Sequence, residues 1–147
     1  MDYYVVEGGI PLEGEIAISG AKNAALPVIV ASLLADGKTT LSNVPDLADI
    51  RTIIKVIECL GAKTAFDTTK NILTIEVDGI KNDKVPYDLV KTMRASVYVM
   101  GPLLGRIGEA DVSLPGGCAI GERPVDIHLS GFEALGTTIE LDSGYIK

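Results

Sequence analysis

The pattern of expected strands and helices occurs twice along the sequence, and this repetition constrains the fold more than any other feature. With a shift of 71 residues, Asn23-Ala24 falls on Arg94-Ala95, and with a shift of 75, Leu60-Gly61 falls on Leu135-Gly136. Such self-similarity indicates two copies of one supersecondary unit. A chain of 147 residues is long enough for one domain with a hydrophobic core. We therefore expect an α/β domain that contains two similar units.

Hydrophobic periodicity and turn residues give the expected elements. Strands are expected at 3–7, 14–18, 38–43, 62–66, 72–77, 109–114 and 137–141, and helices at 23–35, 47–60, 88–104 and 124–135. Helix 23–35 is apolar on nearly every side, which predicts burial. Because 5% of the residues are aromatic and none is tryptophan, the core must consist of Val, Ile, Leu and Ala.

Charge and cysteine usage exclude several classes of partner. The net charge of −7 argues against nucleic acid and against an anionic membrane, since both require a basic surface. No apolar run is long enough to span a bilayer and no positively charged leader is present, so we expect a cytoplasmic protein with reduced Cys59 and Cys118. One histidine and two distant cysteines form no ligand cluster, so neither a metal nor a cofactor is expected. An anionic small substrate is compatible if Lys22, Arg94 and Arg123 come together.

The stretch from Leu114 to Asp126 is the strongest candidate for chemistry. Three glycines and two prolines surround Cys118, a composition typical of a mobile loop. Pro124 suits the first turn of a following helix, whose N–H groups would form an anion site together with Arg123. The four residues by which the two shifts differ lie in this loop, and long loops in compact units are often binding elements. The simpler alternative is a surface turn with an inert cysteine, because a reactive thiol also requires exposure and a lowered pKa.

Three motifs carry a resemblance to a known family. The segment LPGGCAIGERPVDIHL at 114–129 closely resembles the cysteine loop of the UDP-N-acetylglucosamine 1-carboxyvinyltransferases, which are enolpyruvyl transferases. ISGAKNAALP at 18–27 resembles the first motif of that family, and KTMRAS at 91–96 resembles its third. The resemblance covers essentially the whole chain, as the N-terminal portion of such an enzyme. It implies an α/β (α+β) fold: an inside-out α/β barrel lobe of repeated βαβαββ units, here incomplete.

The resemblance also implies a role for each motif residue. Lys22 and Asn23 would contact phosphoenolpyruvate, and Cys118 would be the proton donor and the site that fosfomycin alkylates. The residues that would hold UDP-N-acetylglucosamine are Arg94, Arg123, Pro124, Val125, Asp126 and Ile127. Arg123 would also meet the phosphate of phosphoenolpyruvate. The implied reaction transfers the enolpyruvyl group to the 3′-hydroxyl of the sugar and releases phosphate, which is the first committed step of peptidoglycan synthesis. Glu122 occupies a position that is often a small residue in relatives, so the thiol pKa need not match theirs.

Members of the family continue into a second lobe, which supplies further arginines and an aspartate base. The resemblance implies that residues 1–21 form strands that pair with that second lobe. Residues 22–147 would form part of the first lobe, with about two βαβαββ units and the loop of Cys118. Without the second lobe, strands 3–7 and 14–18 would lack partners, which favours self-association. We therefore expect the isolated chain to be catalytically inactive.

Three alternatives stay open. The shikimate-pathway enolpyruvyl transferases share the fold and the reaction, but their chemistry does not require a cysteine loop. A thiol hydrolase would combine Cys118 with His128, for which the sequence offers no third orienting group. A non-catalytic protein would bind the nucleotide sugar or no ligand. Selective modification of Cys118 by fosfomycin would distinguish the transferase from the hydrolase, and calorimetry with UDP-N-acetylglucosamine would test the third alternative.

Overall fold

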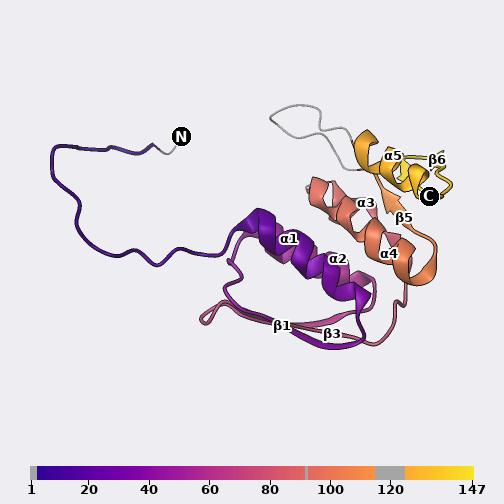
Figure 1. Cartoon of the computed structure of the whole chain (residues 1–147), viewed down its shortest axis with the longest axis horizontal. Coiled ribbons are helices and arrows are strands. Elements are labelled where there is room, and N and C mark those ends of the chain that lie inside the picture. The colour runs from indigo at the N-terminus through magenta and orange to yellow at the C-terminus, as the bar shows by residue number, and fades with distance from the viewer. Residues whose placement is uncertain (1–2, 92, 115–124) are drawn as a thin grey trace.

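The computed structural model describes residues 3–91, 93–114 and 125–147, and within these it leaves out the side chains of Arg94 and Ser96. Figure 1 shows an extended N-terminal segment followed by helices and small sheets. The elements of the first half are α1 (Lys22–Ala31), the 3-10 helix η1 (Ser32–Leu34), β1 (Gly37–Leu41), α2 (Ala48–Cys59), β2 (Lys63–Asp67) and β3 (Ile72–Val77). Those of the second half are β4 (Lys84–Val85), α3 (Tyr87–Val90), the 3-10 helix η2 (Arg94–Val99), α4 (Met100–Ile107), β5 (Asp111–Ser113), α5 (Asp126–Ala134), β6 (Leu141–Asp142) and β7 (Tyr145–Ile146).

The first half forms a three-stranded antiparallel sheet, with the order β1-β3-β2, that lies under α1 and α2 (Figure 1). Leu73, Ile75 and Val77 of β3 are buried, because alternate side chains of a strand point to the same face. The turn between β2 and β3 is closed by Asp67, whose Oδ1 accepts hydrogen bonds from the N–H groups of Thr69 and Lys70, each at 3.1 Å. The predicted hairpin is therefore confirmed.

The second half repeats this strand order. In each half, three antiparallel strands lie in the spatial order first, third, second, counted along the chain. These are β1-β3-β2 in the first half and β5-β7-β6 in the second. The sheet gains a fourth strand because β4 pairs parallel with β5, and α3, η2 and α4 form the crossover between them. In the described part of the chain, no strand occupies the corresponding edge of β1.

Aliphatic side chains fill the core, as the composition predicts. The largest fully buried side chains belong to both halves and include Ile29, Leu33, Ile50, Ile53, Ile57, Leu60, Leu73, Ile75, Leu103 and Ile146. One charged side chain joins the halves: Arg106 of α4 donates from Nη1 to the Leu33 carbonyl at 2.9 Å and from Nη2 to Asp36 Oδ1 at 2.6 Å. The same Oδ1 accepts a hydrogen bond from the N–H of Gly79. Arg106 thus ties α4 to both η1 and the end of β3.

The predicted helix 88–104 is wrong as a single element. The α-helix ends at Val90, Met93 has an extended backbone with φ −145° and ψ 109°, and a 3-10 helix follows before α4. Pro102 gives a physical reason for part of this break. It has no N–H to donate to the carbonyl of Tyr98, so an α-helix cannot continue regularly through residues 98–102.

Three other expectations need correction. Residues 3–21 contain no strand, because a strand exists only with a hydrogen-bonded neighbour and this segment has none within the described chain; strands 3–7 and 14–18 are therefore not formed. Helix α1 is only half buried, since Val28 and, in η1, Leu34 are 49% and 55% exposed. The predicted strand 137–141 is reduced to Leu141–Asp142. In the described ranges, no helix has the length and hydrophobicity to cross a membrane.

Candidate functional site

Several helices begin on the same side of the molecule. In Figure 1, the N-terminal ends of α1 and α5 lie on that side, and α2 begins beside α1. Each helix N-terminus carries unpaired N–H groups and the positive end of the helix dipole. This side of the fold therefore favours an anion. The segment 115–124, which connects β5 to α5 in the sequence, lies outside the described residues, and with it Cys118, Glu122, Arg123 and Pro124.

Lys22 is the first residue of α1, and its ammonium is partly exposed at this side. Its Nζ lies 2.6 Å from Asp49 Oδ2, and Asp49 is in the first turn of α2. α1 has no acidic residue in its first turn and no side-chain cap. A positive side chain at the positive end of a helix opposes the dipole, so this position is suited to a bound anion rather than to helix stability.

The chain before α1 explains how Lys22 is placed. Gly20 lies directly against the carbonyl oxygen of Asn43, where an added Cβ atom would overlap it. Glycine permits this close approach, which sets the start of α1 against the segment that follows β1. Asn23 is exposed next to Lys22. Its carbonyl receives no helical hydrogen bond from position 27, because Pro27 has no N–H.

Arg94 is the first residue of η2, and α1 contacts η2. The sequence overlay places Asn23 and Arg94 at equivalent helix starts, and both do lie at the start of a helical segment, although η2 is a 3-10 helix. Val125 is 7% exposed at the N-cap of α5, and its carbonyl accepts hydrogen bonds from the N–H groups of His128 and Leu129. Asp126 and Ile127 form the exposed first turn of α5, and Ile127 is 82% exposed. Of the predicted site residues, the described ones therefore lie at three helix starts.

Arg51, two residues after Asp49 in α2, is already paired with another carboxylate. Arg51 of α2 donates from Nε and Nη2 to the two carboxylate oxygens of Asp46, both at 2.7 Å. These hydrogen bonds lower the pKa of Asp46 and raise the pKa of Arg51. Arg51 and Asp46 thus satisfy each other, which leaves Lys22 as the partner of Asp49.

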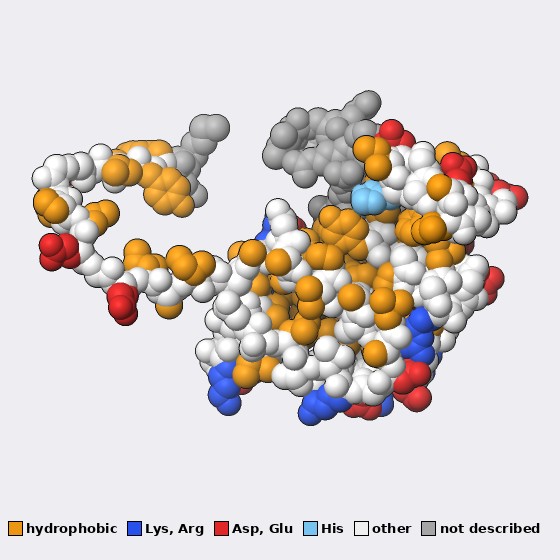
Figure 2. All heavy atoms as spheres, viewed as in Figure 1, with side chains coloured by type: hydrophobic (Ala, Val, Ile, Leu, Met, Phe, Trp, Pro, Cys, Tyr) orange, Lys and Arg blue, Asp and Glu red, His pale blue; other side chains and the backbone are white. Residues whose placement is uncertain are grey.

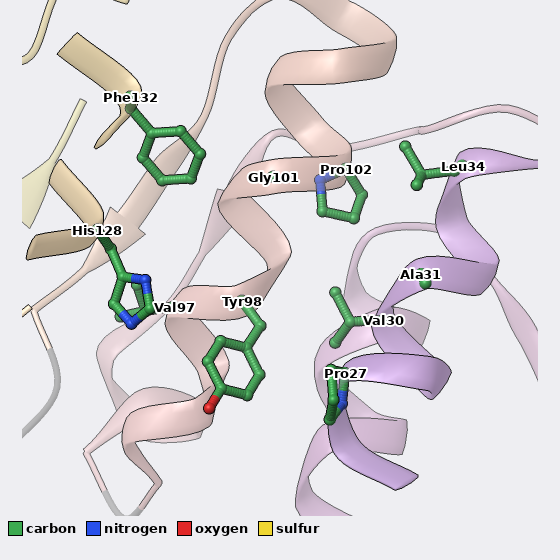
Figure 3. Close-up of a pocket in the computed structure, with 10 residues that line it drawn as sticks. All are labelled: Pro27, Val30, Ala31, Leu34, Val97, Tyr98, Gly101, Pro102, His128 and Phe132. Atoms are coloured by element: carbon green, nitrogen blue, oxygen red, sulfur yellow. The ribbon is translucent and has the colours of Figure 1, made fainter. Parts of the chain in front are cut away.

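An apolar cavity of about 350 Å³ lies between α1, the η2–α4 segment and α5 (Figure 3). Its lining includes Pro27, Val30, Tyr98, His128 and Phe132. Figure 2 shows hydrophobic side chains gathered on this face, with the histidine at their edge. The rings of Tyr98 and His128 meet edge to face, with centroids 6.2 Å apart and an interplanar angle of 76°.

This arrangement gives no support to a thiol hydrolase. Within the described ranges, no carboxylate accepts a hydrogen bond from His128, which instead packs on an aromatic ring. The described residues also contain no group of three or more His, Cys, Asp and Glu side chains that could hold a metal ion.

Asp49 and the apolar cavity are not among the features predicted from the sequence. The available sequence signal was the position of Asp49, an acidic residue in the first turn of the predicted helix 47–60. The cavity has no local signal, because its walls come from helical segments that are far apart in the sequence.

Comparisons with known proteins agree with the motifs. The family model described as EPSP synthase (3-phosphoshikimate 1-carboxyvinyltransferase) matches residues 6–147. The UDP-N-acetylglucosamine 1-carboxyvinyltransferase of Acinetobacter guillouiae is 56% identical over 146 residues, which are 99% of this chain and 34% of the relative. The enzyme of the same name from Idiomarina loihiensis is 52% identical over 147 residues, which are 100% of this chain and 35% of the relative. The chain thus spans about a third of the length of these curated relatives.

Two solved structures share the fold at low sequence identity. The crystal structure of the enolpyruvyl transferase NikO from Streptomyces tendae matches with a TM-score of 0.76 and 24% identity, over 95% of this chain and 30% of that one. EPSP synthase from Acinetobacter baumannii matches with a TM-score of 0.68 and 15% identity, over 90% of this chain and 31% of that one. These matches show part of the enolpyruvyl transferase fold, with mixed α and β structure.

Proposed function

The chain belongs to the EPSP synthase family of carboxyvinyl transferases, and from that premise we propose that it forms part of the active site of a UDP-N-acetylglucosamine 1-carboxyvinyltransferase. The observation that carries the proposal is the 52–56% identity, over essentially the whole chain, to enzymes of that name. The reaction transfers the enolpyruvyl group of phosphoenolpyruvate to the 3′-hydroxyl of UDP-N-acetylglucosamine and releases phosphate, and it serves peptidoglycan synthesis.

The chemistry requires an acid, and we assign that role to Cys118. The sugar hydroxyl gives its proton to a base as its oxygen adds to C2 of phosphoenolpyruvate, and C3 takes a proton from the thiol, which gives a tetrahedral phosphate ketal. C3 then loses a proton as phosphate leaves, and the enol ether remains. A thiol is a suitable donor because its pKa is close to the working pH.

In this proposal, three cationic side chains and the residues beside them bind the anionic substrates. Lys22 and Asn23 hold phosphoenolpyruvate, and Arg123 meets its phosphate. The nucleotide sugar is held by Arg94, Arg123, Pro124, Val125, Asp126 and Ile127. The exposed ammonium of Lys22 at the start of α1 supports this assignment, since fixed positive charge stabilises the phosphate and carboxylate during addition.

The remaining part of the active site comes from outside this chain. The chain corresponds to about a third of its relatives, so we propose that it is inactive alone. We further propose that residues 22–147 are an incomplete inside-out lobe of βαβαββ units; the strand order shared by the two sheets supports this arrangement. In a complete enzyme, residues 1–21 would pair with the second lobe.

A chimeric enzyme tests the proposal. The 147 residues replace the matching third of the Acinetobacter guillouiae relative, and phosphate release is measured with phosphoenolpyruvate and UDP-N-acetylglucosamine. We expect the chimera to turn over and the isolated chain to show no activity. In the chimera, Cys118→Ser should abolish modification by fosfomycin. A folded chimera without turnover, or an active isolated chain, would contradict the proposal.

The shikimate enzyme is the second candidate, because the family model and one solved structure carry that name. The same chimera is therefore assayed with shikimate 3-phosphate in place of the nucleotide sugar. Turnover with shikimate 3-phosphate and none with UDP-N-acetylglucosamine would favour this alternative.

A further inference from the structure

We propose that Asp49 is a positioning residue that holds the ammonium of Lys22 in place for the phosphate of phosphoenolpyruvate. The inference rests on the proposed function, in which Lys22 binds that substrate. It concerns a residue that the motifs do not include, and it starts from the contact of 2.6 Å between Lys22 Nζ and Asp49 Oδ2.

Asp49 itself has a fixed position. It lies in the first turn of α2, next to Ile50, and both Ile50 and Ile53 are fully buried. Thr52 also donates a hydrogen bond from Oγ1 to the carbonyl of Ala48, at 3.0 Å, across the same turn. A carboxylate near the N-terminus of a helix is stabilised by the helix dipole. The backbone that carries the Asp49 carboxylate is therefore anchored by the buried face of α2.

Lys22, in contrast, would be mobile without a partner. Its side chain is 43% exposed, and a free lysine side chain has many rotamers that binding would have to restrict. An ammonium has three N–H groups, and among the described contacts one of them is used by Asp49. The other two can donate to a phosphate while the ion pair is kept.

The pairing is also specific. Arg51, a cation on the same helix as Asp49, is held by both oxygens of Asp46. Asp46 and Asp49 thus form two separate ion pairs at the start of one helix, and only the second includes a proposed substrate ligand. Asp46 therefore provides a matched control.

The experiment uses the chimera, which contains the full chain, with Asp49→Asn, Asp49→Glu and the control Asp46→Asn. We expect Asp49→Asn to raise KM for phosphoenolpyruvate about tenfold, the scale on which loss of preorganisation acts, and to leave KM for the nucleotide sugar within twofold. Asp49→Glu should recover most of the loss, and Asp46→Asn should change neither constant by more than twofold. An unchanged or lower KM for phosphoenolpyruvate in Asp49→Asn would overturn the inference, as would a parallel rise in both KM values.

A second measurement is independent of turnover. Carbon-13 relaxation of the Lys22 side chain in the 147-residue chain should show an ordered Cε in the unsubstituted protein and in Asp46→Asn, and a mobile one in Asp49→Asn. Equal mobility in all three proteins would refute the positioning role. If the unsubstituted chimera is inactive, the proposed function fails, whereas the relaxation data still decide whether Asp49 orders Lys22.

Discussion

Among single residues, charged side chains have two roles in this protein: they join its two halves, and they hold charge where a ligand can reach it. Arg106, whose side chain is 18% exposed, joins the two halves by its hydrogen bonds to Leu33 and Asp36. Lys22, whose side chain is more exposed than that of Arg106, is paired with Asp49 at the edge of the fold. The first pair is suited to stability because its cation is largely covered between the two halves, and the second to binding because its cation is accessible to a ligand.

The Arg106–Asp36 contact predicts a dependence of stability on pH. The hydrogen bond from Arg106, followed by that from the Gly79 N–H, lowers the pKa of Asp36 below its ordinary value of 3.8. A lowered pKa in the folded state means that this contribution is complete above the unfolded value and is lost as the pH falls through the folded one. Asp36→Asn should therefore lower the urea midpoint at pH 7, and the difference from the unsubstituted protein should shrink below pH 3.8.

Glu76→Gln is the control for this prediction. Lys63 and Glu76 form a pair at 4.0 Å with both side chains more than half exposed, and such pairs contribute little to stability. A difference for Asp36→Asn that stays constant across the pH range would contradict the assigned cause.

Among the secondary-structure elements, the residue that follows a helix determines the direction in which the chain continues. Gly61 follows α2 with φ +110°, a conformation that other residues rarely adopt, and an added Cβ would lie 2.8 Å from Lys81 Cγ. Gly131 lies inside α5, and nothing lies within 4 Å of its would-be Cβ. An added methyl group should therefore be unfavourable at Gly61 and tolerated at Gly131.

A pair of alanine substitutions tests this contrast. Gly61→Ala should destabilise the protein by about 1–3 kcal/mol, because both the backbone and Lys81 resist the methyl group. Gly131→Ala should stabilise it by up to about 1 kcal/mol, since alanine favours a helix interior. Both values are obtained from urea unfolding followed by circular dichroism. Equal effects of the two substitutions would show that backbone conformation at Gly61 is unimportant.

At the scale of the whole molecule, the chain divides into a packed part and an unpaired one. Residues 3–21 are extended, and their large apolar side chains are exposed, for example Tyr4 at 98% and Ile16 at 85%. Exposed apolar side chains along an unpaired backbone favour association with other strands. This segment extends away from the helices in Figure 1.

We therefore expect the isolated chain to associate with itself as its concentration rises. Removal of residues 1–18 should weaken this association and leave the packed part intact, because Gly20 lies against Asn43 and Ala21 is the N-cap of α1. The double substitution Val5→Lys and Ile16→Lys should have the same effect without shortening the chain. Sedimentation velocity at several concentrations measures the change. Undiminished association in both variants would place the contact elsewhere, for example at the apolar cavity.

Local sequence patterns were sufficient to predict the elements that need no distant partner. The stripe of Ile50, Ile53 and Ile57 predicted α2, the residues after Asp67 predicted a hairpin, and the motif around Lys22 predicted a helix start. The features that require contacts between distant segments followed from tertiary packing. Strands at 3–7 and 14–18 did not form because no strand among the described residues pairs with them. The predicted helix 88–104 is interrupted after Val90, although its hydrophobic periodicity continues past that point. The contact between Lys22 and Asp49 likewise joins residues that are 27 positions apart, and only the packing of α1 against α2 brings them together.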